Sequence, residues 1–226
     1  MGASRASAHR PSASARARAD ASSARLPPLD DALAKRAPRP VRAVVPQEIF
    51  FVDDALPSPT CRAIIEHIER GHGFVRTTSR GPRHGEAWRV NGRFQADDEA
   101  FARALWRSAR VADAFREHGA EIEDPVGLNP NIRVYRYVEG EHFGAHVDER
   151  VTALGRRSQY TMLLYLSEDV VGGHTIFYDA RGRERCRVAP KTGRALYFRH
   201  GEELPEHEGE AVRGGIKYVL RSDVLF

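Results

Sequence analysis

The feature that most constrains the fold of this chain is a change in hydrophobic period near Asn131. From there, short segments with strand-like patterns follow one another with Gly-containing breaks and no helical segment between them. Among them, NIRVYRYV alternates in polarity, and YTMLLYL is a continuous apolar run typical of a strand buried on both faces. Further strands are predicted at HTIFY, RVAP, RALYF and KYVLRSDVLF. The pattern predicts an antiparallel sandwich or barrel.

Two helices are predicted before this point. The segment SPTCRAIIEHIERGHG offers Ser58 or Thr60 as a cap, places isoleucines on one face and ends at Gly71. The segment ADDEAFARALWRSARVADAFREHG repeats the pattern as one helix, with two aspartates near its start and Gly119 at its close. We expect these helices to cover one sheet, so the predicted fold class is mainly β with flanking helices, an α+β arrangement.

The first 45 residues differ in composition from the rest. They are rich in Ala, Ser, Arg and Pro and poor in acidic and aromatic residues, so they cannot bury enough apolar area to offset the entropy of ordering. Residues 1–45 are therefore predicted to be a disordered basic tail, and the composition also fits an organellar transit peptide. A single folded domain is predicted over residues 46–226.

The charge distribution argues against a nucleic-acid-binding domain. Residues 1–45 hold nine Lys or Arg and three Asp or Glu, although the whole chain has 35 basic and 31 acidic residues. The predicted domain thus keeps 26 basic and 28 acidic residues and is nearly neutral. The electrostatic signature of nucleic-acid binding is weak in such a domain.

The chain is predicted to be soluble, because no apolar run approaches the roughly 20 residues that a membrane span requires. Cys61 and Cys186 are too few and too far apart for a disulfide framework or a zinc finger. Reduced thiols favour a reducing compartment, so we expect a cytoplasmic location unless the N-terminal segment directs the chain to an organelle. The oligomeric state is left open.

A candidate metal site is carried by the segment GEHFGAHVDER. On a strand, side chains two residues apart leave the same face, so His146 and Asp148 are expected to converge. Two histidines and one carboxylate form the site of non-haem Fe(II) oxygenases, with vacant positions for other ligands. A second histidine must come from elsewhere in the chain. His207 and His200 are the candidates, and sequence spacing alone does not separate them.

Four blocks of sequence resemble a known family. The blocks VYRYVEGEHFGAHVD, LYLSEDVVGGHTIF, PKTGRALYF and HEGEAVRGGIKYVLRSDVLF occur in this order with compatible spacing. They resemble the motifs of the iron(II)/2-oxoglutarate-dependent dioxygenase superfamily, in its prolyl 4-hydroxylase-like branch, and the similarity runs from about Glu48 to Phe226. The resemblance implies a double-stranded β-helix (jelly-roll) core.

The resemblance also implies the activity and the metal ligands. The expected enzyme is a hydroxylase that requires Fe(II) and 2-oxoglutarate and releases succinate and CO2, and ascorbate is included among the expected cofactors. The family motif places the metal ligands at His146, Asp148 and His207, which removes His200 from consideration.

Cosubstrate-binding residues follow from the same comparison. The family has a basic residue nine or ten positions after its second histidine that pairs with the far carboxylate of 2-oxoglutarate, and Lys217 stands ten after His207. Arg221 is the alternative anchor, although it shares a strand face with Lys217 and can simply line the same wall. Tyr137 matches a family tyrosine whose hydroxyl contacts 2-oxoglutarate, and the alternative is a core aromatic residue.

The substrate is the least constrained part of the prediction. The polar segment between the two predicted helices carries Trp88, Arg89 and Asn91, and it is expected to be a substrate-facing lid or an ordinary surface loop. His174 stands where the family often has an acidic residue, and it is a further candidate substrate contact, whereas Phe143 replaces a frequent tyrosine. A peptidyl proline or another protein side chain is the leading substrate, followed by a free amino acid or small metabolite, with nucleic-acid demethylation third.

Two rival interpretations remain at this point. In one, the β-fold is a non-catalytic ligand-binding module, although such a module has no need for two histidines, a carboxylate and a cation in this order. In the other, the chain is a cupin-like metal enzyme that does not use 2-oxoglutarate. Such an enzyme has no need for Lys217.

Overall fold

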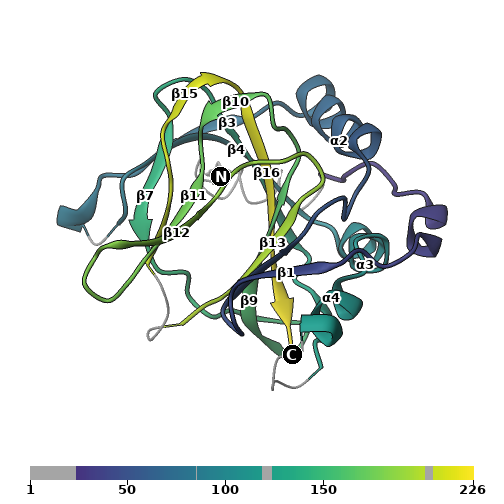
Figure 1. Ribbon diagram of the computed structural model, residues 1–226. Coiled ribbons are helices and arrows are strands. Elements are labelled where there is room, and N and C mark those ends of the chain that lie inside the picture. Colours follow the sequence, from purple (N-terminus) through teal and green to yellow (C-terminus); the bar gives the residue numbers. More distant parts are fainter. Residues whose placement is uncertain (1–23, 85, 119–123, 202–205) are drawn as a thin grey trace, which may run out of the picture.

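The computed structural model describes residues 24–84, 86–118, 124–201 and 206–226. Antiparallel strands dominate it and form a nearly closed barrel, with the three α-helices gathered on one side (Figure 1). The strands are β1 (Val41–Val45), β2 (Ile49–Val52), β3 (Val75–Thr78), β4 (Arg89–Asp97), β5 (Gly127–Leu128), β6 (Asn131–Tyr137), β7 (His142–His146), β8 (Thr152–Ala153), β9 (Arg156–Tyr165), β10 (Val170–Gly172), β11 (Thr175–Tyr178), β12 (Glu184–Val188), β13 (Ala195–Arg199), β14 (His207–Gly209), β15 (Val212–Gly215) and β16 (Lys217–Leu225).

The main sheet runs in the order β1-β2-β13-β9-β16-β6-β4-β7-β14-β11-β12, and β10 pairs with β15 in a separate two-stranded sheet. Apart from β1-β2 and β11-β12, neighbours in this order are not consecutive in sequence, and the pairings between them are antiparallel. This is the topology of a jelly-roll core with flanking helices. The predicted fold class and the strands predicted after Asn131 are therefore confirmed.

Three α-helices, α2 (Ser58–Gly71), α3 (Glu99–Ser108) and α4 (Val111–His118), lie within the described residues, together with the 3-10 turns η1 (Asp31–Lys35) and η2 (Pro82–His84). The end of α2 at Gly71 is confirmed. The predicted cap is wrong, because Pro57 occupies the cap position and makes no side-chain capping bond. Within the described ranges, no helix combines the length and the apolarity that crossing a membrane requires.

The second predicted helix is in fact two helices, α3 and α4. Asp98 caps α3 by accepting a hydrogen bond from the Phe101 amide at 3.0 Å. The chain then turns at Arg110, whose φ of 51° is incompatible with a continuous helix. The Arg110 guanidinium donates to the carbonyls of Ala34 and Arg36 at 3.2 and 3.0 Å, which holds the break in place. The predicted end at Gly119 lies outside the described residues.

The strands shared by two hydrophobic cores position the site. On β16, Leu220 and Val224 pack into the core beneath the helices, while Val219 packs into a second core inside the barrel. Because side chains alternate across a strand, Lys217 and Arg221 share the inner face with Val219. The same alternation holds on β9 and β13. The helix-covered core thus fixes the strands, and their other face carries both the second core and polar residues such as Lys217 and Arg221.

Residues 24–45 differ from the predicted tail. Leu26 is buried in the core beneath the helices, and β1 pairs with β2. The Leu26 amide also donates to the Asp98 carboxylate at 3.0 Å. Long-range pairing supplies the ordering free energy that the composition of this stretch lacks. Residues 1–23 lie outside the described residues, so a tail or transit peptide there stays a prediction, as does the domain organisation.

The polar segment between the early helices is a β-hairpin and not a loop. Its strands β3 and β4 pair with each other, and β4 lies between β6 and β7 in the main sheet. The prediction missed these strands because polar residues occupy their inner face. Arg89, Asn91 and Arg93 alternate along β4 toward the barrel interior, while Phe94 and Ala96 pack into the core beneath the helices.

Candidate metal and cosubstrate site

The structure brings His146, Asp148 and His207 together inside the barrel. His146 ends β7 and His207 begins β14, and these two residues are paired in register. Asp148 lies two residues beyond the end of β7, so it reaches the histidines from a loop and not from a strand. One potential ligand atom from each side chain lies within 4.8 Å of the others.

The three side chains face a common point. The Nε2 atoms of His146 and His207 lie 3.6 Å from the two different oxygens of Asp148, which is beyond ordinary hydrogen-bond length. Asp148 and His207 are each 5% exposed. Two imidazoles and one carboxylate without a thiolate are the donor set of non-haem Fe(II) sites, so the residues present fit that ion.

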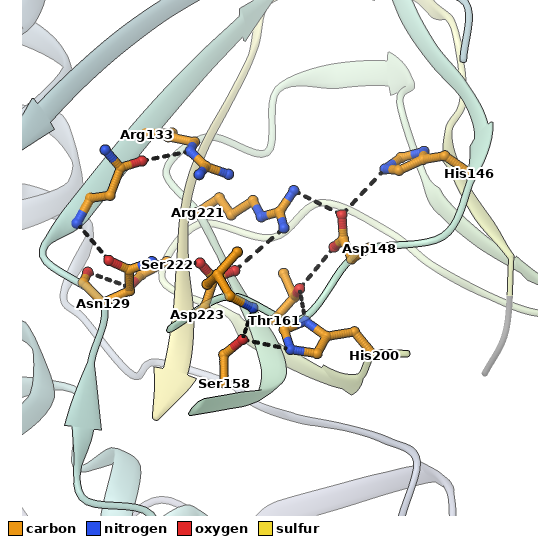
Figure 2. Close-up of polar contacts among 12 residues, drawn as sticks. Asn129, Arg133, His146, Asp148, Ser158, Thr161, His200, Arg221, Ser222 and Asp223 are labelled. Carbon is orange, nitrogen blue, oxygen red and sulfur yellow. Dashed lines mark hydrogen bonds and ion pairs between the residues drawn. The ribbon is translucent and has the colours of Figure 1, made fainter. Parts of the chain in front are cut away.

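Arg221 and Thr161 hold the Asp148 carboxylate (Figure 2). Arg221 Nη1 lies 2.8 Å from Oδ1, and Thr161 Oγ1 donates to Oδ2 at 2.8 Å. Burial alone would raise the pKa of Asp148. The Arg221 guanidinium and the two imidazoles outweigh this effect and hold the pKa well below its ordinary value. The carboxylate is therefore ionised and fixed in orientation.

A buried hydrogen-bond chain continues from Thr161 to His200 and Ser158. His200 Nδ1 lies 3.1 Å from Thr161 Oγ1, and His200 Nε2 lies 2.9 Å from Ser158 Oγ (Figure 2). Since the Thr161 hydroxyl donates to Asp148, His200 supplies the proton on Nδ1. His200 is thus connected to the potential ligand Asp148 only through Thr161. The prediction missed Thr161 and Ser158 because isolated hydroxyl residues in a strand give no sequence signal.

Aromatic rings pack against both histidines. The Phe143 ring stacks on His146 with centroids 3.8 Å apart, and Phe198 lies 4.5 Å from His207. Phe143, which stands where the family frequently has tyrosine, therefore places an apolar ring in direct contact with the potential ligand His146. These rings limit the rotation of the imidazoles and reduce water access to the cluster.

A pocket opens from the cluster along β16 and β6. Its walls include Tyr135, Tyr137, Leu163, Lys217, Val219 and Arg221. Lys217 and Arg221 pair in register with Tyr137 and Arg133. Both cations therefore line the same pocket.

Lys217 is a buried cation, only 3% exposed. Its Nζ lies 5.3 Å from the Tyr137 ring centroid and 5.7 Å from that of Tyr165. Burial lowers the pKa of Lys217 to about 8, although Glu210 acts in the opposite direction. At Gly173, φ is +68° and an added Cβ would lie 3.2 Å from Lys217 Cδ, so glycine suits both the turn and the lysine stem.

Tyr137 and Arg221 take different positions around this pocket. Tyr137 is buried, and its hydroxyl accepts a hydrogen bond from Asn91 Nδ2 at 3.3 Å. Arg221 is engaged on both sides, by Asp148 and by Asp223 Oδ1 at 3.3 Å. The tyrosine is therefore available beside the lysine, whereas the arginine is already paired.

The predicted substrate contacts divide into two groups. Trp88 is 56% exposed, and Arg89 lies over the Phe143 ring with its Cζ 5.1 Å from the centroid. Asn91 is fully buried beside Tyr137. His174 is not among the described residues that line the pocket, and its Nδ1 lies 2.7 Å from Glu210 Oε2 instead.

The jelly-roll barrel and its inward-facing histidines and carboxylate define a metal-dependent oxygenase class. Residues 132–222 match the 2OG-Fe(II) oxygenase superfamily. A search of curated proteins finds no match. The matched segment contains His146, Asp148, His207 and Lys217, so this part of the chain is similar to that superfamily, and the match supports a 2-oxoglutarate-dependent dioxygenase.

Similar solved structures include prolyl hydroxylases. The viral collagen prolyl hydroxylase of Paramecium Bursaria Chlorella virus-1, solved with 2OG, is 15% identical with a TM-score of 0.58, over 79% of this chain and 96% of that one. A Pseudomonas putida prolyl-4-hydroxylase is 19% identical with a TM-score of 0.56, over 79% and 93%. A Trichoplax adhaerens prolyl hydroxylase, solved with a hypoxia inducible factor peptide fragment, is 15% identical with a TM-score of 0.56, over 79% and 84%. These similarities show the shared fold.

Proposed function

We propose that the chain hydroxylates a C–H bond, using His146, Asp148 and His207 to hold Fe(II) and Lys217 to bind the far carboxylate of 2-oxoglutarate. The single observation that supports this most is the convergence of the three potential ligands beside a buried cation in one pocket. When bound, Fe(II) and 2-oxoglutarate supply O2 activation coupled to release of succinate and CO2. Ascorbate stays a prediction.

The chain's own residues orient the metal ligands. Arg221 and Thr161 each bind one oxygen of Asp148, so the carboxylate is presented with its remaining lone pairs toward the histidines. The Phe143 ring restrains His146 in the same way from its stacked position. This arrangement fixes the donor atoms before the metal binds, which reduces the reorganisation cost of binding.

Lys217 suits a dicarboxylate. A buried ammonium is costly to leave without an anion, and a buried carboxylate is costly to leave without a cation, so the two together are more favourable than either alone. The Tyr137 hydroxyl lies on the same inner face and can donate to the same carboxylate. Arg221 is the weaker candidate because Asp148 and Asp223 already engage it.

A peptidyl proline or another protein side chain is the substrate we propose. Supporting this, the fold is shared with prolyl hydroxylases, one of them solved with a peptide fragment. The half-exposed Trp88, which lies beside the pocket strand β7 and contacts Gly144 through its backbone, offers an apolar surface for such a chain. A free amino acid or small metabolite is the alternative.

The test is anaerobic binding of 2-oxoglutarate in the presence and absence of Fe(II). We expect Fe(II)-dependent binding by the natural chain, loss of iron binding in Asp148→Ala, and a raised requirement for 2-oxoglutarate in Lys217→Ala. Mass spectrometry for a +16 Da product then screens peptides and metabolites. Absence of Fe(II)-dependent binding would refute the proposal, and an effect in Arg221→Ala with none in Lys217→Ala would move the anchor to Arg221.

A further inference from the structure

Three arginines face the barrel interior beside the pocket. Arg89 and Arg93 lie on β4 on the same face as Asn91, and the Asn91 hydrogen bond to the pocket residue Tyr137 shows that this face points inward. Arg133 lies on the adjacent strand β6 and pairs in register with Arg221. The three are half-buried and lie next to the residues that line the pocket: Arg93 pairs in register with Tyr135, Arg133 pairs with Arg221, and Arg89 lies over Phe143. We call these three arginines the β4–β6 rim.

The contacts of these arginines are neutral. Arg93 donates to the Gln95 amide oxygen, and Arg133 Nε donates to Asn131 Oδ1 at 2.8 Å. Arg89 lies over the Phe143 ring. Within residues 24–84, 86–118, 124–201 and 206–226, none of the three has an ion pair.

Comparison with Arg136 shows that the lack of ion pairs at these three arginines is a property of their position on the inner face. Arg136 is on β6 between two inward-facing residues, but it points to the helix side and forms an ion pair with Glu69 at 3.3 Å. On the inner side, Figure 2 shows Arg133 next to Arg221, with the carboxylate of Asp148 bound by Arg221. Burial and the neighbouring guanidinium groups lower the pKa of Arg93, although Tyr135 opposes the shift.

The charges at the centre of the site cancel without these arginines. Asp148 and Asp223 balance Lys217 and Arg221, and Fe(II) would balance the two carboxylates of 2-oxoglutarate. Glu208 is the other carboxylate among the described residues that line the pocket, so the three positive charges of the rim still exceed the negative charge left to match them. A half-buried guanidinium attracts an anion more strongly than an exposed one, because the effective dielectric is lower.

We propose that Arg93 and Arg133 bind an anionic group of the substrate, a carboxylate or a phosphate, while Arg89 marks the side of this subsite nearest the metal ligands. The inference rests on the proposed function and adds the chemical class of its substrate. Two guanidinium groups on adjacent strands present paired N–H donors, which match the oxygens of such groups. We assign the subsite to an anionic side-chain group, because the α-carboxylate is common to all free amino acids and would not discriminate between them. An uncharged side chain at this position would leave the charge of the rim unmatched.

The experiment compares matched probes that differ by one charge. One arm uses proline-containing peptides with Glu, phosphoserine or Gln at the same flanking positions, and the other uses free glutamate against free glutamine. Protein loaded with Fe(II) and 2-oxoglutarate is titrated anaerobically, with tryptophan emission as the binding signal, and succinate release is then measured in air. We expect at least one acidic probe to bind about tenfold or more tightly than its amide partner, and the arm that responds identifies the source of the anion.

Substitutions test whether a preference for acidic over amide probes depends on the arginines of the β4–β6 rim. Arg93→Gln with Arg133→Gln should abolish the preference, Arg93→Lys should keep part of it, and the control Arg136→Gln on the opposite face of β6 should keep all of it. Circular dichroism and the 2-oxoglutarate dissociation constant verify that each variant is folded. Equal binding of acidic and amide probes, no response to any acidic probe, or a preference that survives in the double variant overturns the inference. Failure of the natural chain to bind 2-oxoglutarate with Fe(II) is a different result, which refutes the proposed function itself.

Discussion

At the scale of single residues, the proposed role of Lys217 predicts that cosubstrate binding depends on pH. Its pKa of about 8 lies far below the ordinary 10.5 because the side chain is buried between the rings of Tyr137 and Tyr165, with Glu210 as the nearby acidic group. In the proposed function, the ammonium form of Lys217 binds the carboxylate of 2-oxoglutarate. We therefore expect the affinity for 2-oxoglutarate to fall as pH rises through about 8, measured by anaerobic titration across pH 6.5–9.5, a range of about three units around that pKa.

The same lysine has the opposite effect on the stability of the cosubstrate-free chain. Between pH 8 and 10.5 the unfolded chain binds more protons at this position than the folded chain, so this contribution to the free energy of unfolding rises with pH. Lys217→Met should remove both effects. A decline in affinity that persists in Lys217→Met above pH 8 would assign the titration to another group.

Thr161 is expected to control metal affinity through Asp148. Thr161→Val keeps the shape but removes the donor to Asp148 Oδ2 and the partner of His200 Nδ1. We expect Fe(II) or Co(II) affinity, measured by competition with a chelator, to fall about 10- to 100-fold. Ser222→Ala is the control, because it removes a buried hydrogen bond to the Asn129 carbonyl without touching Asp148. Unchanged metal affinity in Thr161→Val would show that Arg221 alone orients the carboxylate.

At the scale of elements, the turn between β12 and β13 depends on Gly193. Its φ is +80°, and an added Cβ would lie 2.1 Å from the Leu56 carbonyl oxygen. Gly182 has φ +71° with nothing within 4 Å of an added Cβ. We expect Gly182→Ala to lower the free energy of unfolding by about 1–2 kcal/mol through backbone strain, and Gly193→Ala to cost about 1–3 kcal/mol more through steric clash.

Chemical denaturation of the two glycine variants measures this difference directly. Equal losses in both would mean that the Leu56 segment moves away from the new methyl group at little cost. Such a result would show that the turn can adjust to the added methyl group. Glycine would then be needed at position 193 only because of its positive φ angle.

At the scale of the whole molecule, we expect the helix-covered core to contribute mainly to stability and the core inside the barrel to contribute to binding. Leu105 on α3 is fully buried in the helix-covered core, whereas Leu163 on β9 lines the pocket. Leu105→Ala should lower the free energy of unfolding by about 2–5 kcal/mol and leave the 2-oxoglutarate dissociation constant unchanged in the folded chain. Leu163→Ala should weaken 2-oxoglutarate binding with a smaller loss of stability. If Leu105→Ala weakens binding equally, the helix layer sets the pocket geometry directly.

Much of this architecture and of the metal cluster followed from local sequence. Strand segments after Asn131 were predictable because both cores require regular apolar alternation, and the ordered family blocks singled out His146, Asp148 and His207, which the structure brings together. The hairpin of β3 and β4 was not predictable, since its inner face is polar and only its partners make it a strand.

The amino-acid order by itself determined a mainly β chain with helices to one side and the proximity of His146 to Asp148, because these depend on periodicity and short spacing. The choice of His207 and Lys217 came from the resemblance of the four sequence blocks to a family. The tertiary structure decided which groups surround them. Pairing of β4 with β6 and of β6 with β16 gathered Arg93, Arg133 and Arg221 on one inner face, and Thr161 reached Asp148 across strands. Long-range pairing register sets such neighbours, and no local pattern encodes it.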